Sequence, residues 1–392
     1  MLRQWLRLSV MGMASLPNRL GASSVIVIGI ACVVAVFISV LAMSAGFKHT
    51  LADSARSDRV IVLRGGSDAE LNSNLTREDM DAIADAPGIA KDATGRILLS
   101  KELITVVNVP KLDTGVDSNL TLRGVGLALS EIRPELRMVE GRMFRPAVRE
   151  LVAGVGAAKQ FRGLTVGKVL HFRNADWTVT GLFSSHGDIH ESELLADVDT
   201  VASSIERQGY SSGVALLTNA NAFMALKDSL TSNPQLTVEV QRETDYYAAQ
   251  SAQLTKIIDV IGKLVAIVMA FGATFGALNS MYSAVAARGK ELATLRAIGF
   301  SPLPVLLSVM TEALTLALLG AMIGALVAWL VVNGHTTSTL GGAFAQVVFK
   351  LAVTPQLVGE AILWACFIGV LGGLFPALRS IRVSVSEALR TA

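Results

Sequence analysis

The stretch Arg288-Gly-Lys-Glu-Leu-Ala-Thr-Leu-Arg-Ala-Ile-Gly-Phe-Ser-Pro302 is a short charged segment between two long apolar ones. Its apolar side chains recur at helical spacing, which predicts a helix with one apolar face. These side chains are Leu292, Leu295 and Ile298. Arg288 and Glu291 stand three residues apart, so we expect them to pair on the surface of that helix.

The end of this stretch carries the signals for one helix to end and another to begin. Gly299 is placed to end the first helix in a left-handed conformation. Ser301 is placed to cap the next helix, with Pro302 at its first position. Two membrane helices joined by such an elbow, residues 288–301, would offer a handle to a cytoplasmic partner. The pattern equally fits a membrane-surface loop that obeys the positive-inside rule.

The composition indicates a membrane protein. The chain has 392 residues, of which 52% are hydrophobic, and a mean hydropathy of +0.52, which is too apolar for an ordinary soluble protein. A net charge of +2 implies no general affinity for nucleic acid. Cys32 and Cys366 both lie in apolar runs, so we expect no disulfide framework and no thiolate metal site.

Four apolar runs predict four transmembrane helices. The first rests on Val25 to Ala45, which has no charged residue and at about 1.5 Å per residue spans roughly 32 Å, enough to cross a bilayer. A signal peptide is the alternative, but this run is longer than its usual apolar core. We expect the helices at 21–45, 252–287, 302–332 and 357–378.

The second of these helices is predicted to begin well before its apolar part. It starts near Thr244 and runs unbroken to 287, a length of about 65 Å, twice what a bilayer needs. The excess should project as a stalk. Ahead of the first span, residues 1–20 fit an interfacial amphipathic helix that breaks at Pro17 and Asn18.

Lysine and arginine placement predicts the orientation. The leader, the elbow and the tail 379–392 are rich in basic residues, so they belong on the cytoplasmic side. Both termini are then inside. The large segment 46–251 and the short connection 333–356 lie outside, which in a bacterium means the periplasmic side of the inner membrane.

The segment 46–251 reads as a folded α+β domain. A strand at Arg59 to Leu63 is followed by a helix through about Ala84, with Thr76 as its cap and Asp79 as the cap's partner. A second strand–helix–strand unit follows 211, its helix capped by Asn219 or Asn221. We therefore expect a split α+β lobe, about 46–94 and 211–251, interrupted by a β-rich insertion at about 95–210.

Motifs for chemistry in this chain are few. The Gly-Lys pairs lack the spacing of a phosphate-binding loop, so the chain is not expected to bind ATP, and we assign no catalytic, cofactor-binding or metal residue. One cluster has side chains that ligate metals, and it reads as either a metal site or a solvated loop. Its members are His186, Asp188, His190, Glu191 and Glu193.

Small residues at helical spacing predict close helix packing in the membrane. The pairs are Gly272 with Gly276, Gly320 with Gly324, and Gly369 with Gly373. Glu312 and Glu360 lie within the third and fourth spans. An intramembrane carboxylate is a functional candidate. Glu312 is near the cytoplasmic end, which favours an interfacial or interhelical hydrogen bond over a proton relay.

The chain resembles the permeases of type VII ABC transporters, the MacB-like and FtsX-like families. The elbow is similar to the cytoplasmic segment of these permeases, in which an acidic residue and two apolar positions precede Leu-Arg and Ala-x-Gly. The tail is similar to their closing segment. In the outer domain, three motifs look like the MacB-type periplasmic core. The tail and outer-domain motifs are Phe375-Pro-Ala-Leu-Arg379, Ser386-Glu-Ala-Leu-Arg390, Leu75-Thr76 to Pro87-Gly88, Glu140-Gly-Arg-Met-Phe144 and Val179-Thr-Gly-Leu182.

The resemblance implies a permease that works by mechanotransmission. It implies a cytoplasmic ABC ATPase as a separate subunit, which binds ATP and Mg, and a second permease copy, identical or related. A periplasmic adaptor, an outer-membrane channel and membrane lipid are further partners of such permeases. ATP binding would move the elbow, and the stalk would transmit the motion to the outer domain for extrusion, or efflux, of a periplasmic or outer-leaflet substrate. It places the contact with the ATPase at Arg288, Glu291, Leu292, Leu295, Arg296 and Phe300.

Two other functions remain open from the sequence. An FtsX-like regulatory permease would activate a periplasmic partner without transport. A membrane-anchored scaffold or receptor would work independently of ATP.

Overall fold

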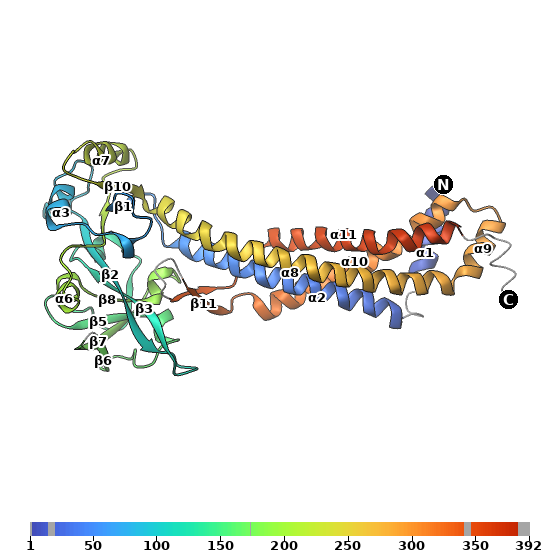
Figure 1. The fold of residues 1–392 in the computed structure, drawn as a ribbon, viewed down its shortest axis with the longest axis horizontal. Helices are drawn as coiled ribbons and strands as arrows, with labels where there is room; N and C mark the ends of the chain where they lie inside the picture. Colours follow the sequence, from blue (N-terminus) through green and yellow to red (C-terminus); the bar gives the residue numbers. More distant parts are fainter. Residues whose placement is uncertain (1, 15–19, 173, 341–345, 383–392) are drawn as a thin grey trace. The chain divides into compact units, whose positions relative to one another are not determined.

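The computed structural model describes residues 2–14, 20–172, 174–340 and 346–382 (Figure 1). The chain forms two compact units. The helical unit comprises Met1–Ala45, Lys256–His335 and Leu351–Ala392, and the sheet unit comprises Gly46–Thr255 and Thr336–Lys350. The break expected at Pro17 and Asn18 and the tail segment Ser386 to Arg390 lie outside the described residues.

A mixed ten-stranded sheet forms the centre of the sheet unit. Its strands run in the order β10-β1-β9-β2-β3-β8-β5-β7-β4, with β6 paired to β7. The pairs β3 with β8 and β5 with β7 are parallel. The strands are β1 Arg59–Arg64, β2 Leu99–Pro110, β3 Asp117–Val125, β4 Arg137–Gly141, β5 Glu150–Gly154, β6 Val169–Phe172, β7 Ala175–Ser184, β8 Glu193–Asp197, β9 Ser212–Leu216 and β10 Val238–Arg242.

The long strand β2 joins the two parts of this sheet. Its residues 99–102 pair with β9, and its residues 103–110 pair with β3. One hydrophobic core follows the sheet across this junction, from Val60 on β1 through Leu103 on β2 to Trp177 on β7, and all three side chains are fully buried. The segments before and after β2 therefore share a single core.

Short helices cover this sheet, and two of them, α3 and α7, begin close to where the sequence predicts a helix. Thr76 and Asp79 form the predicted capping box, and each side chain accepts a hydrogen bond from the other's backbone N–H. Of the two candidate caps for α7, Asn219 is the one that acts, since its side chain accepts from the N–H of Ala222. The helices are α3 Arg77–Ala84, α4 Leu129–Ile132, α5 Val155–Ala158, α6 Val198–Ser204 and α7 Ala222–Thr231, with 3-10 turns η2 Glu70–Asn72 and η3 Ile189–Ser192.

The segment between the last two long helices is a β-hairpin that belongs to the sheet unit. Strands β11 Thr336–Leu340 and β12 Gln346–Lys350 pair in antiparallel register. Phe349 packs edge-on against Phe47, with ring centroids 5.5 Å apart. The Val348 N–H donates to the Ser192 hydroxyl at 2.8 Å. From the sequence we predict a short connection at 333–356 and assign no strand to it.

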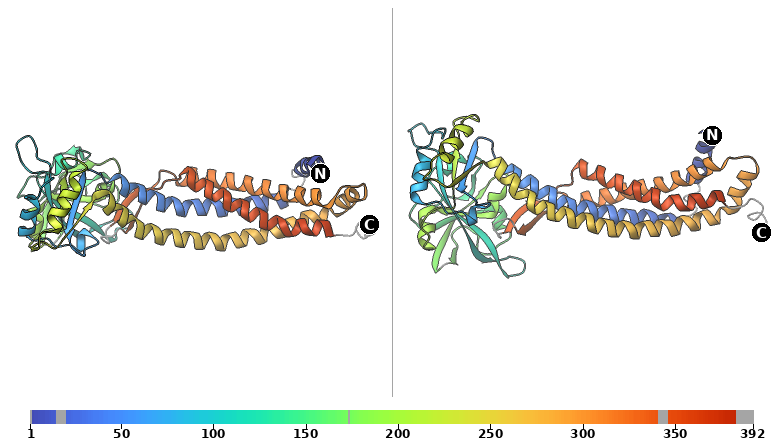
Figure 2. Two further views of the ribbon diagram at one scale, coloured as in Figure 1. Left: turned by 90° about the horizontal axis from the view of Figure 1, so that it is seen from above. Right: turned by 45° about the horizontal axis from the view of Figure 1, so that its top comes forward.

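In the described residues, six helices lie wholly or mostly in the helical unit (Figures 1 and 2). They are α1 Leu2–Ala14, α2 Leu20–Asp53, α8 Glu243–Ala287, α9 Gly289–Ala297, α10 Pro302–Val332 and α11 Pro355–Arg382. Within the described part of the chain, α2, α8, α10 and α11 are long and apolar enough to cross a membrane. The expected unbroken helix from about 244 to 287 is confirmed as α8, whose first residues belong to the sheet unit.

Glycines set the spacing of three of these helices. A Cβ at Gly324 on α10 would lie 2.4 Å from the Ala31 carbonyl oxygen of α2. A Cβ at Gly369 on α11 would lie 2.6 Å from the Cβ of Ala317 on α10. The predicted close packing is confirmed for these two glycine pairs. The third differs, because a Cβ at Gly272 or Gly276 on α8 would meet nothing within 4 Å.

Adding one methyl group at Gly324 is expected to destabilise the helical unit. The Ala31 carbonyl is backbone of α2 and cannot rotate away, so Gly324→Ala forces α2 and α10 apart, at a cost of about 1–3 kcal/mol. The matched control is Gly359→Ala on α11, which points into open space. Thermal unfolding of both variants in detergent measures the difference. Equal unfolding temperatures would contradict the close α2–α10 contact.

Candidate functional site

The elbow between α8 and α10 contains the short helix α9, as predicted. Gly299 has a φ of +102°, which is the left-handed conformation expected after a helix end. The Phe300 N–H donates to the Leu295 carbonyl at 3.1 Å and closes the turn. Pro302 is the first residue of α10, as predicted. The backbone of the elbow is thus fixed by its own sequence.

The predicted cap at Ser301 is only half correct. Its backbone is extended, as a cap requires, but its side chain makes no capping hydrogen bond. A serine cap accepts from the N–H of the second or third helical residue. The third residue of α10 is Pro304, which has no N–H. One of the two donors is therefore missing.

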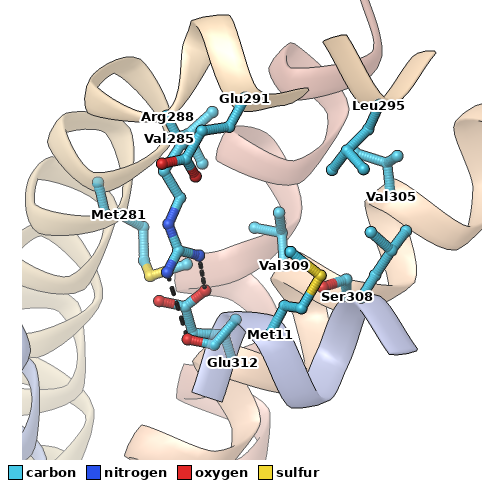
Figure 3. A pocket seen from close by; sticks show the side chains of 13 residues that line it. Met11, Met281, Val285, Arg288, Glu291, Leu295, Val305, Ser308, Val309 and Glu312 are labelled. Carbon is cyan, nitrogen blue, oxygen red and sulfur yellow. Dashed lines mark hydrogen bonds and ion pairs between the residues drawn. The ribbon is translucent and has the colours of Figure 1, made fainter. Parts of the chain in front are cut away.

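The predicted pair of Arg288 with Glu291 is wrong, because Arg288 pairs with Glu312 on α10 instead (Figure 3). Arg288 Nη1 lies 3.0 Å from Glu312 Oε2, and Nη2 donates to the Gly12 carbonyl at 3.2 Å. The two side chains are only 12% and 7% exposed. A buried carboxylate gains far more from a cation than the exposed Glu291 does. Of the interfacial and interhelical hydrogen bonds expected for Glu312, the structure shows the interhelical one.

Helix α1 completes this junction. The Trp5 indole N–H donates to the Thr311 hydroxyl of α10 at 3.1 Å. Leu8 and Gly12 are buried on the same face of α1, and Leu6 and Val10 are exposed on another. Sequence reasoning assigned α1 to the membrane surface and missed this contact. The repeat of Trp5, Leu8 and Gly12 at helical spacing is the signal that could have found it.

A cavity of about 250 Å³ lies between these helices. Apolar side chains of α1, α8 and α10 form its walls, and the Arg288–Glu312 pair lies at one side (Figure 3). Three of the predicted contact residues line it: Arg288, Glu291 and Leu295. Two others, Arg296 and Phe300, are half-buried in the elbow and do not line the cavity. The side chain of Leu292 lies outside what the structure describes.

The outer surface of the elbow combines charge with an apolar side chain. Glu291 and Lys290 are exposed, and Ile298 is 68% exposed. A protein that docks here would meet both signs of charge and one large apolar contact. Arg288, the residue before α9, forms hydrogen bonds to α10 and α1. A displacement of α9 would therefore also shift these two helices.

The second candidate cluster, in the sheet unit, folds as a largely buried turn and not as the solvated loop that is one of its two interpretations. The Asp188 side chain accepts from the His190 N–H at 2.9 Å, and the Glu191 side chain accepts from Ser184, Ser185 and Gly187. Asp188, His190 and Glu193 are buried. In the described residues, no group of three such side chains is placed to hold a metal ion. The cluster is a folded turn held by its own side chains.

This turn leads to a buried ionic group centred on Arg123. The guanidinium of Arg123 lies within hydrogen-bond distance of three buried carboxylates, at 3.0 Å, 2.7 Å and 2.7 Å. These belong to Glu70, Glu102 and Glu193. His190 Nδ1 is 3.1 Å from Glu193 Oε2. Burial alone would raise the pKa of Glu193, but Arg123 and His190 outweigh it and hold that pKa well below its usual range.

A second buried group holds the first residue of α8. The two oxygens of Glu243 each lie 2.6 Å from an arginine, Arg59 on β1 and Arg133 after α4. All three side chains are at most 2% exposed. Arg59 also pairs with Glu135. The beginning of α8 is thus fixed to the sheet unit by charge as well as by packing.

Acid is expected to destabilise the sheet unit. The Arg142 side chain, with Arg145, holds the pKa of Glu150 well below its usual range. A carboxylate whose folded pKa is depressed stabilises the fold above its unfolded pKa of about 4.3, and loses this as the pH falls. The unfolding temperature of the purified chain should therefore fall as the pH is lowered from about 5 to 3. Glu150→Gln should have a lower unfolding temperature at pH 7 but a weaker dependence of that temperature on pH. Glu78→Gln, an exposed change on α3, should keep the pH dependence of the wild type. A Glu150→Gln slope equal to that of wild type would contradict this assignment.

Comparison with known proteins covers both units. Residues 21–255 match the family model of the MacB-like periplasmic core domain, and residues 263–385 match that of the FtsX-like permease C-terminal region. No curated protein matches the chain. The two family models together cover most of the sequence.

Solved structures similar to this chain correspond to one domain. One is the extracellular domain of the noncanonic ABC-type transporter YknZ from Gram-positive bacteria, with 17% identity, a TM-score of 0.37, and coverage of 47% of this chain and 99% of that one. Another is the periplasmic region of MacB from Actinobacillus actinomycetemcomitans, with 14% identity, a TM-score of 0.37, and coverage of 52% and 94%. A third is a domain of a putative permease protein from Porphyromonas gingivalis, with 13% identity, a TM-score of 0.30, and coverage of 47% and 85%.

Proposed function

Because the chain belongs to the family of MacB-like and FtsX-like ABC transporter permeases, we propose that it couples ATP hydrolysis by a separate cytoplasmic ATPase to extrusion of a substrate outside the membrane. The ATPase would hold the ATP and Mg. The permease itself would contribute a mechanical connection, with the sheet unit in the periplasm, both termini in the cytoplasm and the long helices in the bacterial inner membrane.

The observation that carries this proposal is the connection of the elbow through Arg288. An ATPase that grips α9 at Glu291, Arg296 and Ile298 would move the residue that follows α8. Arg288 pairs with Glu312 on α10 and donates to Gly12 on α1. One displacement would therefore act on three helices at once. A membrane-surface loop whose basic residues only follow the positive-inside rule would not need this buried ion pair between helices.

The construction of α8 supports a mechanical role. It is one helix of 45 residues, Glu243–Ala287, without a proline. Its first residue is a glutamate that ion pairs fix to the sheet unit, and the elbow follows its last residue. A continuous helix resists compression better than a loop, so motion applied at one end reaches the other. In this proposal the motion of α8 drives the sheet unit.

The test is co-purification with candidate cytoplasmic ABC ATPases from the same organism, and ATP hydrolysis of the complex in lipid nanodiscs. We expect the double variant Glu291→Ala/Arg296→Ala to lose most of the permease-dependent hydrolysis or the complex itself. The matched control is Arg77→Ala/Glu78→Ala on α3, which removes the same two charge types from exposed positions of the sheet unit. Full hydrolysis by the elbow variant would overturn the coupling role. Absence of any complex would favour an anchor that works without ATP.

A further inference from the structure

The cavity between α1, α8 and α10 has an apolar wall and a polar edge (Figure 3). Four side chains of the wall are buried, each with 6% exposure or less. These are Leu8, Met281, Val305 and Val309. Water in the cavity would leave this wall in contact with solvent, whereas an apolar group would cover it. The wall therefore favours a ligand that has an apolar part.

The volume of the cavity and its methionines indicate that this apolar part is an aromatic ring. A protein cavity of about 150 Å³ holds benzene. The volume of about 250 Å³ has room for such a ring with a short side chain. Met11 on α1 and Met281 on α8 both line the cavity. The sulfur of methionine makes favourable contacts with aromatic rings.

The polar edge is a single cluster around Gly12. A Cβ at this position would lie 3.5 Å from Glu312 Oε2, 3.6 Å from Ser308 Oγ and 3.7 Å from Arg288 Nη1. Glycine has no side chain, so these three polar groups are not separated from the cavity by one. The Ser308 hydroxyl both donates and accepts hydrogen bonds, so it suits a hydroxyl group of a ligand.

The charge of the cavity favours a cation. Of the described residues that line it, Glu291 and Glu312 are acidic and Arg288 is basic. The Arg288 guanidinium already pairs with Glu312. An anion would therefore meet two carboxylates and only one cation, which is already paired, whereas a cation would compensate the negative charge of Glu291. A ligand with one positive charge makes the lining neutral.

We propose that this cavity binds a small amphipathic amine, in which an aromatic ring carries a hydroxyl group and one ammonium group. Met11 is 62% exposed and Glu291 is also exposed, so the cavity opens to the protein surface and such a molecule can enter. The ring would lie against the apolar wall, and the ammonium group beside Glu291. Binding needs no ATPase, so this inference does not depend on the proposed coupling.

Protection of a cysteine in the cavity tests the proposal on the full chain in lipid nanodiscs. Cys32→Ala and Cys366→Ala first remove the native thiols. Val309→Cys or Met11→Cys then places one thiol in the cavity, and Thr294→Cys places one on the exposed surface of α9 as the control. The rate of modification by methyl methanethiosulfonate, a small neutral reagent, is measured with three probes. Phenylethanolamine, 1-phenylethanol and mandelate share a phenyl ring and a hydroxyl group and are cationic, neutral and anionic.

The cationic probe should protect the cavity best. We expect phenylethanolamine to slow the modification of Val309→Cys and Met11→Cys, with half-protection at a concentration about tenfold lower than for the other two probes. This factor lies between the weak effect of an exposed ion pair and the strong effect of a buried one. No probe should slow the modification of Thr294→Cys. Adding Glu291→Gln should remove most of the advantage of the amine over the neutral alcohol.

Three results would overturn the proposal. They are equal protection by all three probes, equal protection of Thr294→Cys, and no protection at either cavity position. An advantage of the amine that Glu291→Gln leaves unchanged would also overturn it, because the charge would then act elsewhere. The measurement contains no ATPase. Its failure therefore leaves the coupling role untouched, and a failure to bind any ATPase leaves this site untouched.

Discussion

Replacement of Arg123 by methionine is expected to destabilise the full chain by about 3–5 kcal/mol, the cost of leaving buried charges without their partner. Arg123 is 3% exposed and is the cation that contacts Glu70, Glu102 and Glu193. Methionine fills much of the volume but neutralises none of the three carboxylates. Thermal unfolding of the purified protein measures the loss, and poor expression would be its first sign.

The control for this variant is Arg96→Met, which removes an exposed arginine that also pairs with two carboxylates, Asp92 and Glu131. Exposed pairs contribute little, so its effect should be small. Adding Glu102→Gln to Arg123→Met removes one uncompensated charge and should restore part of the stability. An Arg123→Met protein as stable as wild type would show that these carboxylates are protonated or hydrated in the folded state.

The second large effect is expected at the elbow. Arg288→Met removes the guanidinium that pairs with the buried Glu312 carboxylate, and Glu312→Met removes the carboxylate that pairs with the buried Arg288 guanidinium. Each single change should cost about 3–5 kcal/mol, while the double change should cost clearly less than their sum. Arg288→Lys should not restore the wild type, because one ammonium group cannot reproduce the two-pronged contact with Glu312 and the Gly12 carbonyl.

Thermal unfolding in detergent provides the four values of this double-mutant cycle. Lys290→Met is the control, because it removes an exposed positive charge from the same helix. ATP hydrolysis with the partner ATPase is measured on the same samples. Additive losses of stability in the cycle would mean that Arg288 and Glu312 do not interact. That result would also contradict the proposal that the elbow transmits motion through this pair.

Local signals in the sequence predicted the local structure well. The capping box of Thr76 and Asp79, the left-handed turn at Gly299 and the start of α10 at Pro302 each depend on a few neighbouring residues. The unbroken course of α8 follows from a long stretch without proline or a strong break. Such features are set by backbone sterics and nearby hydrogen bonds, which a single sequence displays directly.

Contacts between distant residues were not predictable in this way. Arg288 has a plausible partner three residues away in Glu291, yet it pairs with Glu312, because burial changes the worth of an ion pair and a sequence does not display burial. From the sequence alone, the turn around His190 is interpreted as a loop. Its buried position becomes clear only when the fold places Arg123 beside Glu193. Several candidate partners are usually present for a charged residue. Which of them it pairs with depends on which ones the fold buries away from water.

The β11–β12 hairpin has a consequence for how the chain can be divided. The sheet unit is discontinuous: its polypeptide is interrupted by more than one long helix before Thr336–Lys350 returns to it. A recombinant fragment ending at Thr255 would leave Phe47 without the ring of Phe349 and the Ser192 hydroxyl without its Val348 donor. To reproduce the native unit, such a fragment needs the hairpin grafted back through a linker or supplied as a separate peptide.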